Sequence, residues 1–180
     1  MQEHYYYEKD GKKIYLDGEG KPPIFVQAII DNKQMSAIDF FRITDMYMNW
    51  DEEGNDELVL EPLINFLARW GDDLIFAFDD RMAQLLYDID TKAIATKAYK
   101  NEYISPDMFL YNRCVALINS KPFYNQIRNG KRKLDKDVEF ESILYVPSRA
   151  WANLHGCRID EYSHITPVSY ESFSNKNGWA

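Results

Sequence analysis

The sequence predicts an α+β fold that is predominantly α-helical, with an N-terminal β-hairpin or small antiparallel sheet packed on a bundle of five or six helices. Two observations predict it. The turn sequence Asp10-Gly11 separates two short runs typical of strands, and from residue 36 onward apolar residues recur at spacings of three and four. At 180 residues the chain has the length of one domain. We therefore expect a single globular domain over 1–180, with a small sheet over 1–30, a helical core over 36–156 and an irregular tail over 157–180.

The hairpin is predicted by the residues on either side of the turn. Asp10-Gly11 supplies the positive φ angles of a type I′ turn. With that turn, residue 7 faces 14, residue 6 faces 15, residue 8 faces 13 and residue 5 faces 16. The face that we expect to be buried carries Tyr5, Tyr7, Ile14 and Leu16. Farther along, the apolar run Ile24–Ile30 predicts a third strand.

Helical periodicity begins at residue 36. Ser36 followed by Asp39 resembles a capping box and starts a helix over 36–50. A second helix has Pro62 in its first turn and ends at Gly71. A third helix begins at Asp72 and has the clearest apolar stripe in the chain, which consists of Leu74, Ile75, Phe78, Met82, Leu85, Leu86 and Ile89.

The second half of the chain predicts three more helices. Ser105-Pro106 combines an N-cap residue with a proline that suits the first helical turn. A short helix is predicted over 123–128. A last helix over 140–154 contains Pro147, which should kink or split it because proline lacks the N–H that the helix ladder needs.

Acidic residues are concentrated in one part of the chain. The net charge is −8, so the protein as a whole repels nucleic-acid backbones and anionic lipid. Residues 51–90 contain 12 acidic and 2 basic residues, whereas 91–150 contain 6 acidic and 11 basic residues. The acidic segment is either a solvated helix face or a docking surface for a basic partner. The candidate docking residues are Asp72, Asp73, Asp79 and Asp80.

Cysteine content and the N-terminal sequence predict a cytoplasmic protein. Cys114 and Cys157 are the two cysteines, too few for a disulfide framework, and we expect both to be free thiols. The N-terminus has neither the basic nor the apolar segment of a secretion signal, and no apolar run is long enough to span a membrane.

The sequence contains no motif of a common catalytic, metal or cofactor site. His155, Cys157 and His164 are near one another, but their spacing fits no zinc pattern and a fourth ligand is missing. The 8 glycines form no phosphate-binding loop. We therefore expect no resident metal, no cofactor and no catalytic residue.

Arg113 is the most informative charged residue. It follows Phe109 by four positions, so both lie on the same side of a helix and the guanidinium is held within or near the core. A semi-buried arginine needs an acidic partner. The candidate partners are Glu139 or Glu141 on the last helix, and Asp88 or Asp90 after the third helix. Arg113 then either forms a structural ion pair between helices or grips a ligand in a cleft, for which the candidate residues are Asp107, Arg113, Tyr124, Glu139 and Glu141.

The same block resembles a known family. The pattern Ser105-x-Asp107-x-Phe109-x-x-x-Arg113, then Tyr124, then Glu139-Phe140-Glu141-x-x-Leu144-Tyr145, is similar to that of the bacterial "domain of unknown function 4240" family. Phe40-Phe41 resembles the early aromatic helix of that family, and the resemblance extends over about residues 36–152. It implies a mostly helical cytosolic protein with no established activity, and therefore no catalytic residues to transfer.

These observations favour a non-enzymatic acidic protein that binds a basic macromolecular partner. A bacterial immunity protein that neutralises a basic toxin fits this description, because complementary charge gives fast association. The alternative is a small enzyme or ligand sensor with a cleft around Arg113. We expect neither nucleic acid nor membrane as a partner, and the sequence does not indicate an oligomeric state.

Overall fold

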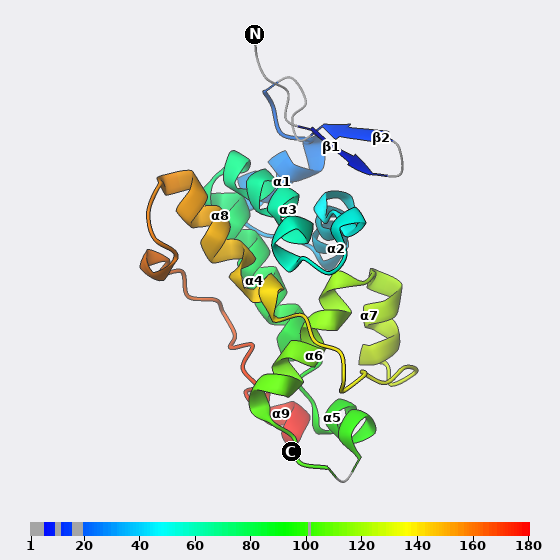
Figure 1. Cartoon of the computed structure of the whole chain (residues 1–180). Coiled ribbons are helices and arrows are strands. Elements are labelled where there is room, and N and C mark those ends of the chain that lie inside the picture. Colours follow the sequence, from blue (N-terminus) through cyan, green and yellow to red (C-terminus); the bar gives the residue numbers. More distant parts are fainter. Residues whose placement is uncertain (1–5, 10–11, 16–19, 101) are drawn as a thin grey trace.

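The described part of the chain is helical. The computed structural model describes residues 6–9, 12–15, 20–100 and 102–180, and Figure 1 shows helices along nearly all of their length. The predicted α+β class, with a sheet packed on the helices, is therefore wrong. The run Ile24–Ile30, predicted as a third strand, belongs to helix α1 (Ile24–Asn32).

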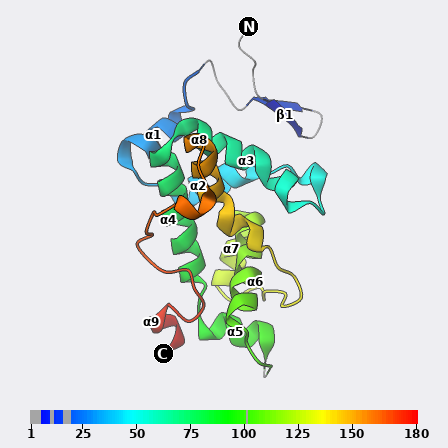
Figure 2. The same cartoon turned by 60° about the vertical axis from the view of Figure 1, so that its left-hand side comes forward.

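Two four-residue strands lie at the N-terminal end of the molecule (Figures 1 and 2). β1 (Tyr6–Lys9) pairs antiparallel with β2 (Lys12–Tyr15), and Tyr7 faces Ile14 as the turn predicted. The predicted turn, and the pairing of residue 5 with residue 16, lie outside the described residues. Such a short ribbon forms no layer of a sheet, and the buried core described for the chain is drawn from residues 26–150.

α1 is a helix because its apolar residues follow a helical spacing as well as a strand-like one. Val26 and Ile29 are three residues apart and both are buried, while Phe25 and Ile30 pack beside them on the same core. The helix ends at Lys33, whose φ of 51° places it in the left-handed region. A short apolar run is ambiguous between strand and buried helix, and tertiary packing decides for the helix here.

The remaining helices outnumber the predicted ones. In the described ranges they are α2 (Ala37–Tyr47), α3 (Asp56–Trp70), α4 (Asp72–Asp88), α5 (Lys92–Tyr99), α6 (Pro106–Ile118), α7 (Lys121–Arg128), α8 (Val146–His155) and α9 (Lys176–Trp179). Short 3₁₀ segments are η1 (Trp50–Glu52), η2 (Glu141–Tyr145) and η3 (Ile159–Glu161).

α4 lies at the centre of the molecule and contacts α1, α2, α3, α6 and α8. Every residue of its predicted apolar stripe is buried, from Leu74 to Ile89. On one side Phe78 stacks on Phe40 of α2, with ring centroids 4.7 Å apart. The stripe therefore forms the core, as its periodicity predicted.

The two prolines predicted to lie at helix boundaries have different positions in the structure. α3 begins at Asp56 after the N-cap Asn55, so Pro62 lies inside the helix rather than in its first turn as predicted. Pro147 divides the last predicted helix: η2 precedes it, and α8 begins anew with this proline in its first turn. The predicted split is confirmed.

The C-terminal tail, residues 157–180, runs from the end of α8 past α4 and α6 to α9, which packs on α5 (Figures 1 and 2). The backbone of α9 lies very close to the segment between α4 and α5. A Cβ atom on Gly178 would lie 2.9 Å from the carbonyl oxygen of Asp90 and 2.8 Å from Thr91. Glycine is therefore required for α9 to reach this position.

Candidate functional site

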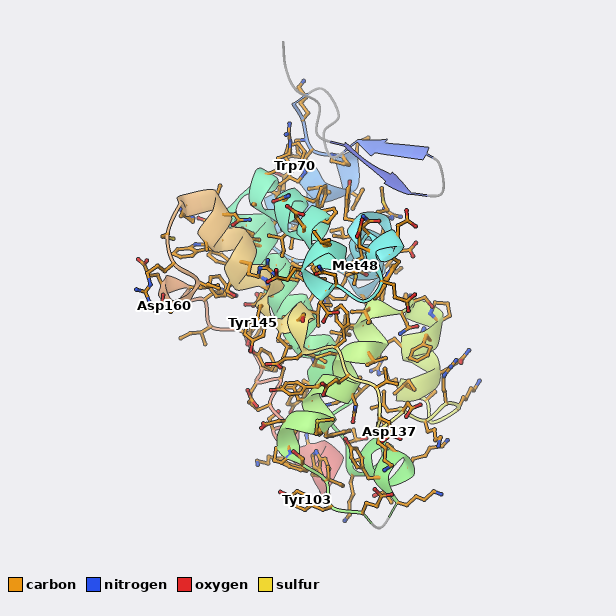
Figure 3. All side chains as sticks on the ribbon, viewed as in Figure 1. Met48, Trp70, Tyr103, Asp137, Tyr145 and Asp160 are labelled. Atoms are coloured by element: carbon orange, nitrogen blue, oxygen red, sulfur yellow. The ribbon has the colours of Figure 1, made fainter. Side chains whose placement is uncertain are left out.

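An open cleft of about 610 Å³ lies between α6, η2 and the tail. α6 contributes Asp107 and Tyr111, and η2 contributes Glu141 and Tyr145. The tail forms the opposite wall from Tyr162 to Glu171, and α4 contributes Asp79. In Figure 3, the labelled Tyr145 lies near the middle of the molecule, between α8 and α6.

Glu141 lies between two tyrosines. The Tyr145 hydroxyl donates a hydrogen bond of 2.6 Å to Oε1 of Glu141, which raises the pKa of Tyr145 to about 12. Burial and the Glu141 carboxylate also raise the pKa of Tyr111. Both tyrosines therefore stay protonated at neutral pH and act as hydrogen-bond donors at this end of the cleft.

Asp79 and Tyr162 form the other end. The Tyr162 hydroxyl donates to Oδ2 of Asp79 at 2.8 Å. Asp79 is 6% exposed, and burial raises its pKa although Tyr162 and His164 act in the opposite direction. Burial and the Asp79 carboxylate raise the pKa of Tyr170 too. The cleft is thus a region of negative potential at both ends.

We expect Asp79→Asn to stabilise the protein at pH 7 by on the order of 1 kcal/mol, which is roughly 2–4 °C in melting temperature for a chain of this size. The raised pKa means that folding disfavours the charged carboxylate, so its cost is present above that pKa and is lost as the pH falls through it. Asparagine keeps an oxygen that accepts from Tyr162. Thermal unfolding at pH 7 and at pH 4 measures the effect; a lower melting temperature for the variant at pH 7 would contradict the assignment.

The predicted cleft residues are only partly brought together. Asp107 and Glu141 line the cleft. Glu139, two residues before Glu141, is exposed and lies outside it. Tyr124 is buried between helices and donates to the carbonyl oxygen of Leu85 at 2.8 Å, so it also lies outside the cleft.

Arg113 is fully buried and has a structural role rather than a ligand-binding one. Its guanidinium donates to the carbonyl oxygens of Leu86 and Tyr170, at 2.8 and 3.0 Å, and to the Ser172 hydroxyl at 3.0 Å. These acceptors are uncharged, so the expected direct ion pair is replaced by hydrogen bonds that join α6, α4 and the tail. Burial lowers the pKa of Arg113, and the charge of Asp90 opposes that change.

Asp90 is the buried residue among the four acidic partners predicted for Arg113. It is fully buried after the end of α4 and accepts from the backbone N–H groups of Phe173 and Asn175, at 3.1 and 3.0 Å. It also accepts from Nε1 of Trp179 at 2.9 Å. Together, Arg113 and Asp90 attach the tail to the helices and so place one wall of the cleft.

The four aspartates predicted as a docking surface all have partners within the chain. Asp72 contacts His155 at 2.8 Å, Asp73 pairs with Lys33 at 3.1 Å, and Asp80 contacts His164 at 2.7 Å. Asp79 accepts from Tyr162, as described above. Three of these partners follow residue 154, so much of the predicted surface is used to hold the last part of the chain against α4.

The cleft tyrosines were also missed by the sequence analysis. Tyr111 follows Asp107 by four residues, and this helical spacing was the signal that could have placed it beside the predicted cleft. Tyr162 and Tyr170 lie in the tail, where no periodicity places them.

Cys114 and Cys157 are both free, as predicted, and burial raises the pKa of Cys114 to about 12. Across the described ranges, no group of three or more histidine, cysteine, aspartate or glutamate side chains is arranged to hold a metal ion. Within the same ranges, no helix is both long and apolar enough to cross a membrane.

Comparison with known proteins identifies one family. A family model described as "Protein of unknown function (DUF4240)" matches residues 35–153, which run from α2 into α8. No curated protein and no solved structure matches the chain.

Proposed function

Because the chain belongs to the DUF4240 family, whose description assigns no activity, we propose a function from the cleft itself: the protein binds a cationic group of a basic partner protein between α6, η2 and the tail. One observation carries this proposal. Among the described residues that line the cleft there is no lysine or arginine, whereas Asp79, Asp107, Glu141 and Glu171 all line it.

The tyrosines strengthen the preference for a cation. An ammonium or guanidinium group is attracted to the face of an aromatic ring, and Tyr111, Tyr145, Tyr162 and Tyr170 all line the cleft. Burial raises the pKa of Tyr111, Tyr162 and Tyr170, and nearby carboxylates raise the pKa of all four tyrosines further. The negative potential of the cleft carboxylates disfavours an ionised tyrosine and favours a cationic ligand.

The partner in this proposal is a basic protein, since a net charge of −8 increases the association rate with a partner of opposite charge. In the cytoplasm, an immunity protein that neutralises a basic toxin would use the cleft in this way. The cleft thus replaces Asp72, Asp73 and Asp80 as the proposed docking site, because these three aspartates are already paired within the chain. Asp79 is kept, since it lines the cleft.

A small enzyme or sensor built around Arg113 receives less support. Its arginine is 0% exposed and contributes nothing to the cleft lining. The volume of about 610 Å³ is nevertheless within the range of small-molecule sites, so a free cationic metabolite is the second candidate occupant.

A peptide-binding experiment tests the proposal. We expect a fluorescently labelled hexa-arginine peptide to bind, and Glu141→Gln to weaken binding by about threefold to tenfold, as measured by fluorescence anisotropy. Glutamine keeps the acceptor for Tyr145 but removes the charge. Glu139→Gln is the matched control, since Glu139 is exposed, lies two residues away and does not line the cleft.

The outcomes separate the candidates. Binding that weakens with salt and with Glu141→Gln but not with Glu139→Gln supports the cleft. Equal effects of the two variants would show that the peptide responds to overall charge, and no binding would reject a basic protein partner. Free arginine methyl ester that binds as tightly as the peptide would favour the small-molecule sensor.

A further inference from the structure

A second pocket, of about 330 Å³, lies between the start of α5 and the end of α7 and has the opposite charge. Lys97, Arg128, Arg132 and Lys133 line it, and among the described residues of its lining there is no aspartate or glutamate. In a chain with a net charge of −8, four cationic side chains around one small cavity form a region whose charge is opposite in sign to that of the whole chain. The proposed function does not use this pocket.

Two of the four cations are already engaged within the chain. Lys97 donates through Nζ to the carbonyl oxygen of Gly130, and Arg128 pairs with Asp88 at 3.4 Å. Arg132 and Lys133 form no side-chain hydrogen bond or ion pair with the described residues, and the Arg132 guanidinium lies over the Phe123 ring, 4.3 Å from its centroid. Stacking fixes the guanidinium while leaving its N–H groups free for a ligand.

The basic segment after α7 is an ordered turn rather than a loose loop. Gly130, with a φ of 67°, permits the chain to reverse, and its N–H donates to the carbonyl oxygen of Ile127 at 2.9 Å. The N–H groups of Lys131 and Arg132 both donate to the carbonyl oxygen of Gln126, at 2.8 and 3.0 Å. The cationic side chains therefore project from a fixed backbone, which lowers the entropic cost of binding an anion.

The opposite wall is also suited to an anion. Thr91 caps α5, whose first turn contains no acidic residue, so the positive end of the helix dipole is not neutralised within that turn. Ala93 is exposed and Ile94 is 8% exposed, and both add an apolar surface to the lining. The pocket thus combines cationic hydrogen-bond donors, which suit an anion, with an apolar patch that a non-polar group can cover.

We propose that this pocket binds a small phosphate ester. Arg132 and Lys133 hold the phosphate, since arginine presents paired donors that match phosphate oxygens. The organic part covers Ala93 and Ile94. A cavity of about 330 Å³ suits a metabolite, and the overall negative charge disfavours a long polyanion.

Isothermal titration calorimetry with AMP as the probe tests this proposal on the whole protein. We expect saturable 1:1 binding that weakens at least tenfold in Arg132→Gln/Lys133→Gln. Lys121→Gln/Arg149→Gln is the matched control, because it removes the same charge from residues that do not line the pocket, and it should change the affinity less than twofold. Equal weakening in the two variants would overturn the proposal.

Two further probes and one variant complete the test. Inorganic phosphate should bind more weakly than AMP; equal affinity would exclude recognition of the organic part. A decathymidylate single strand that binds more than tenfold more tightly than AMP would indicate nucleic acid and overturn the small-ligand assignment. Glu141→Gln should bind AMP normally, so failure of this pocket is distinguishable from failure of the cleft. Far-ultraviolet circular dichroism checks that each variant is folded.

Discussion

Replacing Arg113 with methionine is expected to lower the free energy of unfolding by about 3–5 kcal/mol. Methionine fills much of the volume but donates no hydrogen bond, so the carbonyl oxygens of Leu86 and Tyr170 and the hydroxyl of Ser172 lose a donor inside the protein. An acceptor left unsatisfied in the interior costs about 1–3 kcal/mol before the structure relaxes. Urea denaturation followed by circular dichroism measures the loss.

Arg149→Met is the control for this prediction. Arg149 is on α8, is only partly buried and forms no side-chain hydrogen bond with the described residues, so its replacement should cost less than about 1 kcal/mol. An unchanged melting temperature for Arg113→Met would contradict the structural role of Arg113 and would favour the alternative that Arg113 binds a ligand.

Replacing Asp90 with asparagine is expected to cost about 2–4 kcal/mol and to release the tail. Both carboxylate oxygens accept hydrogen bonds: Oδ1 from Phe173 and Trp179, and Oδ2 from Asn175. An asparagine NH₂ group must occupy one of these positions, where a donor then faces a donor. Urea denaturation gives the free energy, and limited proteolysis within residues 157–180 reports the release.

Asp88→Asn is the matched control, because Asp88 is two residues away. Its side chain is 25% exposed and its ion pair with Arg128 is solvent-accessible, so the change should cost about 0–1 kcal/mol and leave the tail protected from protease. Equal protease sensitivity in the two variants would show that Asp90 does not hold the tail.

The structure explains which parts of the fold the sequence could predict. The stripe of α4 was clear because seven apolar residues repeat at helical spacing over a long segment. α1 was mistaken for a strand because nine residues are too few for periodicity to separate the two states. α5 was not predicted as a helix, although Thr91 caps it, because its alanine and lysine residues form only a weak apolar stripe.

The site was harder to predict because its parts are far apart in the chain. Asp107 and Glu141 were found through local motifs on two neighbouring elements. The contacts of Asp90 with Asn175, and of Asp79 with Tyr162, join residues more than 80 positions apart, and no local pattern indicates them. The same distance explains the docking hypothesis on α4, because the sequence shows the aspartates but not the distant residues, such as His155 and His164, that pair with them.

The tail links the stability of the protein to the proposed binding. Arg113 and Asp90 hold it through buried hydrogen bonds, and the segment between Tyr162 and Glu171 then forms a wall of the cleft. Loss of either anchor should therefore weaken binding of a basic partner even in the fraction of protein that remains folded.

The most direct test of the proposed binding is a nuclear magnetic resonance titration of the native protein with the hexa-arginine peptide. We expect the largest changes in amide and tyrosine ring signals at Tyr111, Leu144, Tyr145 and Tyr170, with small changes at Asp72 and Asp73. Shifts concentrated around Asp72 and Asp73, with the cleft tyrosines unaffected, would contradict the account and would return the docking site to the surface of α4.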